Sequence, residues 1–477
     1  MKFQVIAGIL VRILSISALA LAACIPVAAY FGESVSVFAF SAGIAAATAL
    51  VLHFFTRHKN IAFSKRESFL SVGLAWIAIS FVGTLPYLIS STIPSFTDAL
   101  FESVSGFSTT GASIFTDVES LPKSILFWRS LTSWIGGIGI IMLVIVVMPS
   151  LKMGNYQMFS MESSLQERVT PRFKSLGYRI LMIYIFLTAL NTALLHLGDM
   201  PLFDSLCHAL STMASCGFST KNASFMDYSP YIQYVTTLFM IFSGVNFTVF
   251  YFLFKGRFSK IRDNEELRYY LLFILVSGVI VAAILVFRNQ RDLETALRES
   301  FFQIVSVLTT TGFSSADYLF WHKSAWVFIA IVSICGGCMG STSGGIKMGK
   351  TIILIKNIQQ QFRNFTHPNS VRKITLNKKI ISQDENNAVI SFIALYFLSI
   401  AAGSVILLCF NIDVQTAVSA VVSCIGCVGP GFGTVGPTGN FAHLPDAVKL
   451  LLSFFMILGR LEFYTILILF LPAFWKR

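Results

Sequence analysis

Four short segments that each contain a glycine carry the residues best suited to binding an ion. When the chain is aligned on Gly111, Gly217, Gly312 and Gly429, a serine stands six residues before each glycine, and Asp, Glu or Thr stands thirteen residues before it. Residues of the latter kind cap a helix N-terminus or favour it electrostatically. Each segment is therefore predicted to be a short capped helix followed by a turn.

The predicted chemistry of these turns is the binding of a monovalent cation. The carboxyl end of a helix carries about half a negative charge, and turns rich in Thr, Ser and Gly present carbonyl oxygens that replace the hydration shell of such a cation. The turns contain no carboxylate, which argues against a divalent-selective site. In the alternative reading, each turn simply ends a helix. The candidate ion-binding residues are Thr109, Thr110, Gly111, Ala112, Ser215, Cys216, Gly217, Phe218, Thr310, Thr311, Gly312, Phe313, Cys427, Val428, Gly429 and Pro430.

The spacing of the four glycines indicates an internal repeat. They are 106, 95 and 117 residues apart, which indicates four copies of a helix, a short re-entrant helix and a second helix. Because non-helical backbone cannot face lipid, the four turns are expected around one central axis. The predicted organisation is two N-terminal membrane helices (1–56), repeat 1 (57–149), repeat 2 (150–254), repeat 3 with a broken second helix (255–357) and repeat 4 (358–477).

The composition requires a membrane. Of the 477 residues, 55% are hydrophobic and 12% are charged, about half the charged fraction of an average globular protein, and the mean hydropathy is +0.73. These values exclude an ordinary soluble or disordered protein. Ten apolar runs are long enough to cross a bilayer core of about 30 Å, namely 5–31, 35–55, 69–91, 125–149, 177–198, 230–254, 267–287, 324–356, 388–410 and 447–471. The predicted fold is an all-α polytopic membrane protein with ten spans and four re-entrant half-helices around one pore.

The net charge of +12 is located in the loops between the apolar runs. If the N-terminus is cytoplasmic, the inside segments hold 26 Lys and Arg against 8 acidic residues, and the rest of the chain holds 9 against 15. Since basic loops stay in the cytoplasm, both termini are predicted to be cytoplasmic. The basic face would suit an acidic protein or anionic membrane lipid, although topology alone explains most of it. Nucleic acid is not expected as a partner.

A second functional element is predicted in repeat 3, where glycines interrupt an apolar run. Each glycine costs about 1 kcal/mol relative to alanine in a helix, so an unwound loop that lines the water path is expected; close packing of small residues between straight helices is the alternative. Arg460 lies in the last apolar run, and an arginine at this depth should face the pore or a partner group. The candidate gate residues are Gly336, Gly337, Gly340, Ser341, Thr342, Ser343, Gly344, Gly345, Lys347 and Arg460.

Three further patterns are interpreted as unrelated to function. Residues 344–351 spell a phosphate-binding loop, G-x-x-x-x-G-K-[ST], but they lie at the end of a membrane span rather than in a soluble α/β domain. Two Cys-x-x-Cys pairs, at 335–338 and 424–427, fall in different repeats and are not expected to share a metal. His208 is expected to satisfy neighbouring turn groups rather than to catalyse a reaction.

The most informative segments resemble the Trk/Ktr/HKT superfamily of potassium transport proteins. They are 105–112, 306–313, 336–347, Trp134-Ile-Gly-Gly-Ile-Gly139 and Leu458-Gly-Arg-Leu-Glu462. The resemblance covers nearly the whole chain, and the two extra N-terminal spans favour the TrkH branch over the KtrB branch. It implies a pore subunit of the bacterial inner membrane, with K⁺ at the filter turns, the loop 336–347 as a gate and no cofactor. It also implies a homodimer with one pore in each protomer, regulated by a cytosolic, nucleotide-binding ring of the TrkA type that acts on the basic stretch 350–379.

The fourth turn departs from the pattern of that family, because residues 427–430 lack Thr and include proline. This turn is expected to offer fewer regular carbonyls, so strict selectivity for K⁺ over Na⁺ is less secure than K⁺ permeation. The sequence leaves a channel, a K⁺ symporter coupled to H⁺ or Na⁺, and a less selective K⁺/Na⁺ pore open. A polytopic membrane enzyme is disfavoured, since it would predict His and carboxylates clustered at one face of the bilayer, and the loops contain no such cluster.

Overall fold

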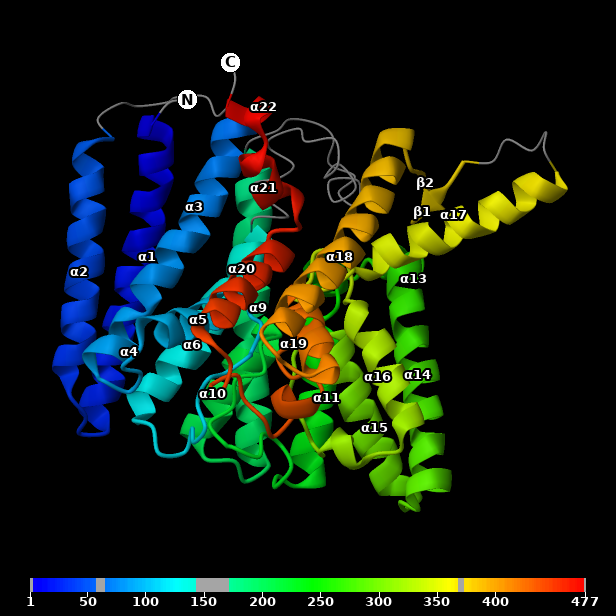
Figure 1. Ribbon diagram of the computed structural model, residues 1–477, viewed down its shortest axis with the longest axis horizontal. Helices are drawn as coiled ribbons and strands as arrows, with labels where there is room; N and C mark the ends of the chain where they lie inside the picture. Colours follow the sequence, from blue (N-terminus) through cyan, green and yellow to red (C-terminus); the bar gives the residue numbers. More distant parts are fainter. Residues whose placement is uncertain (1–2, 57–64, 143–170, 368–372, 476–477) are drawn as a thin grey trace.

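The computed structural model describes residues 3–56, 65–142, 171–367 and 373–475. Two long helices, α1 (Phe3–Tyr30) and α2 (Val35–Phe54), lie side by side at one edge of the molecule (Figure 1). Helix α1 also packs against α3 and α6, which attaches the pair to the first repeat. The two chain ends lie at the same end of the molecule (Figure 1).

The remaining elements follow the order expected of four repeats. The first repeat contains α3 (Lys65–Gly83), α4 (Leu85–Ile89), α5 (Phe96–Phe107) and α6 (Lys123–Met142). The second contains α9 (Pro171–Leu197), α10 (Leu202–Ala214), α11 (Pro230–Ser243) and α12 (Phe247–Phe254). The third contains α13 (Phe258–Arg262), α14 (Glu265–Asn289), α15 (Leu293–Leu308), η3 (Tyr318–Phe320), α16 (Lys323–Ile334) and α17 (Met348–Thr366). The fourth contains β1 (Thr375–Leu376), β2 (Lys379–Ile380), α18 (Gln383–Cys409), α19 (Val414–Gly426), η4 (Gly433–Val435), α20 (Asp446–Arg460), α21 (Tyr464–Leu467), η5 (Ile468–Phe470) and α22 (Pro472–Trp475).

The short re-entrant helices are α5, α10, α15 and α19, and they begin earlier than expected. Their first turns are preceded by Ser95, Pro201, Asp292 and Asp413, and the Ser and Asp side chains among these accept a backbone N–H bond from the first turn. The residues thirteen before each glycine, predicted to lie at the start, are therefore inside the helices. Asp98 and Asp204 lie in the first turn, where a negative charge is still favourable.

Three of the ten predicted spans are not continuous helices. In the described residues, seven helices are long and apolar enough to cross a membrane, and two bent pairs would raise this number to nine. The bends are 97° between α11 and α12 and 111° between α20 and α21. The run 324–356 is divided into α16 and α17 by a loop at residues 335–347, as the glycines predict. The end of the predicted span 125–149 and most of the inside segment 150–179 lie outside the described residues.

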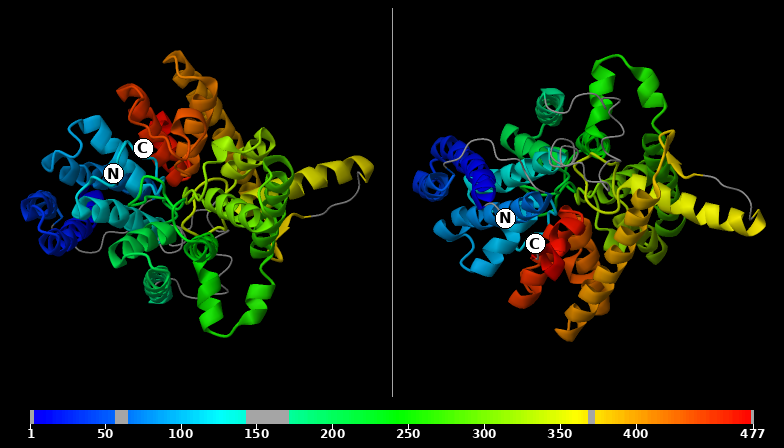
Figure 2. Two further views of the ribbon diagram at one scale, coloured as in Figure 1. Left: turned by 90° about the horizontal axis from the view of Figure 1, so that it is seen from below. Right: turned by 90° about the horizontal axis from the view of Figure 1, so that it is seen from above.

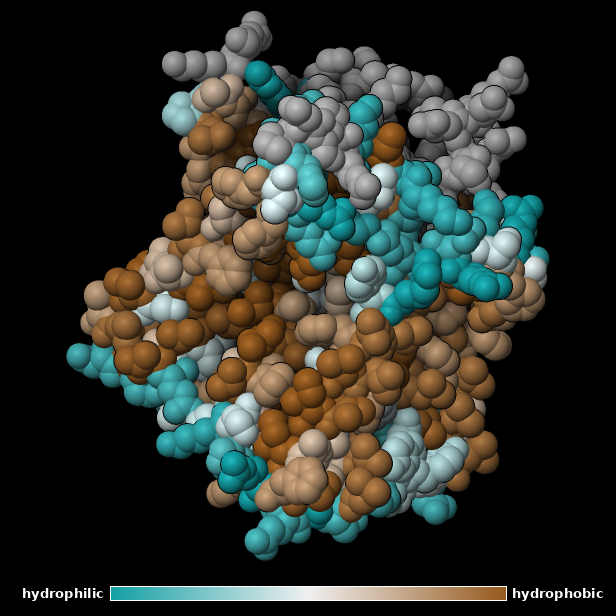
Figure 3. All heavy atoms as spheres, turned by 90° about the vertical axis from the view of Figure 1, so that its right-hand side faces the viewer, coloured by the Kyte–Doolittle hydropathy of each residue, from teal (hydrophilic) through white to brown (hydrophobic). Residues whose placement is uncertain are grey.

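A belt of apolar side chains surrounds the molecule. Figure 3 shows it as a broad brown band between hydrophilic regions on one side of the protein. On α14 the exposed side chains include Leu272, Leu275 and Val279. Such a belt is what lipid contact requires, and the chain is accordingly an all-α, multi-pass membrane protein.

A candidate ion-binding ring and the loop beneath it

All four candidate turns have the same backbone conformation. The residue two positions before each glycine is left-handed, with φ of 56° at Thr109, Ser215 and Cys427 and 55° at Thr310. The glycines that follow have φ of 79°, 82°, 83° and 97° in chain order, a region that L side chains seldom adopt. The alignment of the repeats on their glycines is thus reproduced in the backbone.

The serine six residues before each glycine supports its turn through its main-chain carbonyl. In every repeat this carbonyl accepts the N–H of the residue just before the glycine. The four bonds run from Thr110 to Ser105 (2.9 Å), Cys216 to Ser211 (3.1 Å), Thr311 to Ser306 (2.8 Å) and Val428 to Ser423 (2.9 Å). Because they use carbonyls near the helix end that have no partner within the helix, they fold the chain back over that end.

The turns close into a ring. A Cβ atom added to each glycine would meet a carbonyl oxygen of the next turn: that of Cys216 for Gly111, Thr311 for Gly217, Val428 for Gly312 and, at 2.7 Å, Thr110 for Gly429. Each turn therefore touches the next, and the fourth touches the first. We call the main-chain oxygens of Thr110, Cys216, Thr311 and Val428 the carbonyl ring.

The expectation of an irregular fourth turn is largely wrong. Cys427 and Gly429 take the same left-handed conformations as their counterparts, and Val428 makes the same bond to Ser423. Proline at 430 follows the glycine, so its missing N–H does not interrupt this pattern. The turn differs in degree: Gly429 has the largest φ of the four glycines and the loosest approach to the next carbonyl.

Side-chain hydroxyls make the ring two-fold rather than four-fold symmetric. In the first repeat Ser108 Oγ lies 2.7 Å from Thr110 Oγ1, and in the third Thr309 Oγ1 lies 2.8 Å from Thr311 Oγ1. The second and fourth repeats have Ala and Gly at the first position and Cys and Val at the second, so no such hydroxyl pair forms there. The carbonyl ring is the part that all four repeats share.

A water-accessible cavity of about 140 Å³ opens onto one side of the carbonyl ring. Its lining includes all four turn glycines and loop residues such as Ser113, Asn222 and Gly439. Arg129 and Lys221 are its charged lining residues. We call this cavity the vestibule. Figure 2 shows the helices of the repeats arranged around a common centre.

An ion pair beside the vestibule was not predicted from the sequence. Glu102 and Arg129 are both buried and lie 2.8 Å apart, from Oε1 to Nε. Arg129 falls within the predicted span 125–149, so the argument applied to Arg460 would have singled it out as well. In the second repeat, His208 occupies the position equivalent to Glu102, and its Nε2 lies 2.9 Å from Ser219 Oγ. His208 thus satisfies a turn group, as predicted.

The glycine-rich loop at residues 335–347 lies against the other side of the ring. Gly344 N donates to Thr310 Oγ1 (2.7 Å), and Thr342 Oγ1 lies 2.8 Å from Ser215 Oγ. These contacts reach residues that precede the carbonyl ring, whereas the residues that follow it line the vestibule. All the predicted gate residues of repeat 3 lie in this loop.

The loop is held by the break between α11 and α12. Cys338 N donates to the carbonyl of Gly244 (2.8 Å), and Thr342 Oγ1 donates to that of Ser243 (3.1 Å). Glu266 Oε1 accepts the N–H groups of Met339 (2.7 Å) and of Gly349 at the start of α17 (2.9 Å). The bend therefore frees carbonyls that the loop then binds.

Arg460 binds the same loop from the end of α20. Its Nη1 donates to the carbonyl of Thr342 (2.7 Å) and its Nη2 to that of Gly136 on α6 (3.3 Å). Lys347 Nζ donates to the carbonyl of Ser343 (2.5 Å) within the loop. The sequence predicts that the run 447–471, which contains Arg460, is one continuous span; in the structure α20 ends at Arg460 and the chain bends directly after it. Glu462, in the turn after α20, pairs with Lys350 at 3.0 Å rather than with Arg460.

The segment that spells a phosphate-binding loop and the cysteine pairs lie in surroundings unlike those of a nucleotide or zinc site. Residues 344–351 lie in the glycine-rich loop and the first turn of α17. In the loop, Gly344 contacts the candidate ion-binding turn of repeat 3. Among the described residues, no group of three or more His, Cys, Asp or Glu side chains could hold a metal ion.

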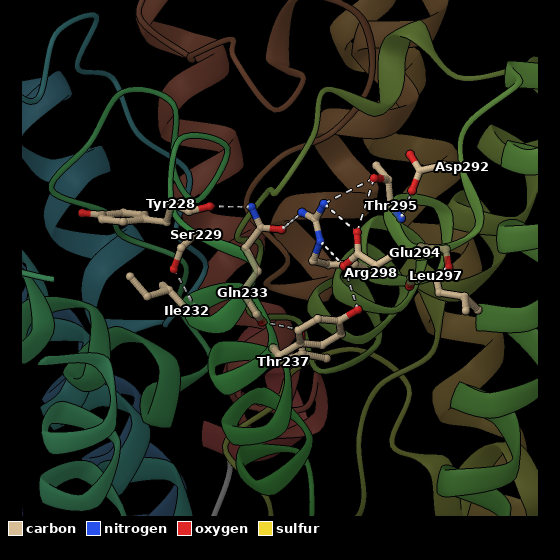
Figure 4. A network of polar contacts seen from close by, with 12 residues as sticks. Tyr228, Ser229, Ile232, Gln233, Thr237, Asp292, Glu294, Thr295, Leu297 and Arg298 are labelled. Carbon is tan, nitrogen blue, oxygen red and sulfur yellow. Dashed lines mark hydrogen bonds and ion pairs between the residues drawn. The ribbon is translucent and has the colours of Figure 1, made fainter. Parts of the chain in front are cut away.

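A second Arg–Glu pair joins two repeats at a distance from the ring. Arg298 Nε lies 2.9 Å from Glu294 Oε1, and Arg298 Nη1 donates to Gln233 Oε1 (2.6 Å), as Figure 4 shows. Gln233 in turn donates to the carbonyls of Phe225 and Tyr228. This network links α11 to α15, and none of its bonds reaches a ring residue.

Four helix–turn–helix repeats around a closed ring of main-chain carbonyls define a membrane protein of the cation-transporting class. Comparison with known proteins agrees, and the chain belongs to the TrkH family: the family's sequence model, described as cation transport protein, matches residues 34–477. The family assignment separates the chain from enzymes.

Individual relatives match most of the chain. It is 34% identical over 447 residues to the Trk system potassium uptake protein TrkI of Halomonas elongata, covering 92% of this chain and 90% of that protein. It is 35% identical to TrkG of Escherichia coli, named in the same way, with 88% of each chain covered. The crystal structure of the potassium transporter TrkH from Vibrio parahaemolyticus superposes with a TM-score of 0.92 at 29% identity, over 100% of both chains.

Proposed function

We propose that this protein takes up potassium ions through the carbonyl ring, which serves as a selectivity filter. The observation that carries the proposal is the closure of four main-chain carbonyls, from Thr110, Cys216, Thr311 and Val428, around one centre. Such rings replace the hydration shell of a monovalent cation. The potassium uptake proteins among the relatives support K⁺ as the ion. The repeats proposed to build the pore are 57–149, 150–254, 255–357 and 358–477, after the N-terminal helices 1–56.

The glycine-rich loop is proposed to be a closed gate. Its contacts with Ser215 and Thr310 hold it against the inner ends of two filter turns. Arg460 fixes the loop through the carbonyl of Thr342, and its positive charge opposes the passage of a cation. Opening would require this hydrogen bond to break and the loop to move away from the turns.

Helix α17 is the proposed link between the gate and other proteins. It begins directly after the loop and projects from the body of the molecule (Figure 2). Ile355, Ile358, Phe362 and Phe365 form an exposed apolar stripe along it, a spacing typical of helix–helix contact. This stripe supports a homodimer, and the basic stretch around α17 supports a cytosolic TrkA-type regulator.

The proposed location is the bacterial inner membrane, with both termini in the cytoplasm. The excess of Lys and Arg in one set of loops supports this orientation. The two chain ends lie at the same end of the molecule (Figure 1), as an orientation with both termini on one side of the membrane requires.

The test is Rb⁺ flux into liposomes that contain the purified protein, with Na⁺ as competitor. A Gly111→Ser variant places a Cβ against the carbonyl of Cys216 at a φ of 79°, so its Rb⁺ flux should fall about five- to thirtyfold, the effect of roughly 1–2 kcal/mol of strain. The matched control is Gly43→Ser in α2, where an added Cβ meets nothing within 4 Å.

Selective Rb⁺ flux that Gly111→Ser reduces and Gly43→Ser leaves unchanged would support the proposal. Absence of flux even after addition of the cytosolic partner would contradict it. Flux that requires an H⁺ or Na⁺ gradient would favour a symporter over a channel, and equal Rb⁺ and Na⁺ flux would favour the less selective pore.

A further inference from the structure

We propose that the buried Glu102–Arg129 pair is a selectivity-determining clamp on the first two filter turns. The inference rests on the proposed function and assigns a role to residues outside the ring. Arg129 Nε lies 2.8 Å from Glu102 Oε1, and the side chains are 2% and 0% exposed. A pair so fully removed from water is costly unless each charge is satisfied by further bonds.

The pair makes those further bonds to the chain that follows the ring in two different repeats. Glu102 Oε2 accepts the N–H of Ile114 (3.0 Å), and Ser113 Oγ donates to both carboxylate oxygens at 3.1 Å. Ser113 and Ile114 come directly after the first filter turn. Glu102 therefore holds the outer end of that turn.

Arg129 reaches the second filter turn. Its Nη1 donates to the carbonyl of Ser219 (3.3 Å), and its guanidinium carbon lies 4.3 Å from the ring centroid of Phe218. Phe218 directly follows Gly217, which lies against the carbonyl of Thr311. A planar guanidinium can stack on a ring and donate in several directions at once, so one side chain fixes two turns relative to each other.

In the other three repeats, the position equivalent to Glu102 has no carboxylate. The positions equivalent to Glu102 are His208, Gln303 and Ala420. His208 also binds Ser219, through its hydroxyl. The amide atoms of Gln303 have no hydrogen-bond partner among the described residues, and alanine has no polar group. At this aligned position, only the first repeat has a carboxylate, and that carboxylate is paired with an arginine.

The clamp also has an electrostatic consequence for ion entry. Arg129 lines the vestibule, and a positive charge there repels an approaching cation unless a nearby negative charge compensates for it. Glu102 supplies that charge. Removal of the Glu102 charge alone should therefore hinder entry, whereas removal of both charges should restore entry and leave the turns unclamped.

The experiment measures Rb⁺ flux and the K⁺/Na⁺ permeability ratio of the full-length protein in liposomes at low and high ionic strength. For Glu102→Gln we expect Rb⁺ entry to fall about tenfold at low salt, with a smaller loss at high salt because salt screens the uncompensated charge. For the double variant Glu102→Gln/Arg129→Gln we expect Rb⁺ entry near that of the wild type and a K⁺/Na⁺ ratio about tenfold lower, the effect of losing one charge-assisted hydrogen bond.

Two further variants complete the test. Arg129→Lys keeps the charge but loses the planar fork, so Rb⁺ entry should be normal and the K⁺/Na⁺ ratio reduced. This variant therefore tests the effect of the clamp on selectivity even if the double variant does not fold. Glu294→Gln/Arg298→Gln removes the matched pair of Figure 4, which bonds no ring residue, and should leave both quantities within about twofold of the wild type.

Wild-type selectivity in folded Arg129→Lys or in the folded double variant would overturn the clamp. Unchanged Rb⁺ entry in Glu102→Gln at low salt would overturn its electrostatic part. Failure of the wild type to conduct Rb⁺ would instead contradict the proposed function, and it is measured in the same preparation.

Discussion

Removal of the Arg460 side chain should release the glycine-rich loop. In Arg460→Ala the loop loses the 2.7 Å bond from Nη1 to the carbonyl of Thr342, whereas the bond to Gly136 involves α6 and not the loop. A hydrogen bond from a charged donor contributes about 2 kcal/mol, which corresponds to about a thirtyfold rise in the ratio of open to closed gates. Lys347 and Gly344 still hold the loop, so the gate is destabilised rather than removed.

The assay is basal Rb⁺ flux in liposomes without any cytosolic partner. Arg460→Ala should raise this flux by about thirtyfold or more, since the loss of a positive charge from the path acts in the same direction as the loss of the hydrogen bond. Arg460→Lys keeps the charge with a single ammonium group and should give an intermediate flux. Flux that is unchanged or lower in correctly folded Arg460→Ala would refute the gate reasoning.

Two further predictions concern the two ends of the path. Lys350 and Glu462 lie 3.0 Å apart and tie the start of α17 to the bend after α20; Glu462→Gln should therefore raise basal Rb⁺ flux about five- to tenfold, the effect of roughly 1–1.5 kcal/mol, and an unchanged flux would show that this pair does not restrain the gate. Near the vestibule, a hydrogen bond from the Asn222 side chain lowers the pKa of Asp117, so its negative charge is present at neutral pH and is lost only as pH falls below the ordinary value of about 3.9. Cation flux should thus stay constant between about pH 7 and pH 5. Asn222→Ala should raise the pKa of Asp117, which a carboxylate titration by NMR would detect, and an unchanged pKa would contradict this assignment.

The four turns that share one backbone conformation could be located from the sequence because that conformation has local causes. A glycine at φ of 79–97° and a left-handed residue two positions earlier are needed in every repeat, and in all four segments a serine stands six residues before that glycine. The loop at 335–347 could also be predicted from the sequence, since five glycines within ten residues are incompatible with a helix. Both features can therefore be recognised in the sequence without knowledge of any tertiary contact.

The bends at 243–247 and 460–464 were not predicted, because each lies within a longer run that is apolar on average despite a few polar residues. The hydropathy of a segment indicates that it is apolar, but it does not indicate which groups form hydrogen bonds with its backbone carbonyls. Here the loop N–H groups bind the carbonyls of Ser243 and Gly244, so the break is stabilised by residues about a hundred positions away. The Glu102–Arg129 contact likewise joins two helices, and no local pattern connects its partners.

The measurement that tests the central claim most directly is the location of Rb⁺ by anomalous scattering in crystals of this protein. A peak on the axis of the carbonyl ring, bounded by the oxygens of Thr110, Cys216, Thr311 and Val428, is the predicted result, and it should disappear in Gly111→Ser. A well-phased map with the ring empty, and with Rb⁺ bound at side-chain carboxylates elsewhere, would contradict the account.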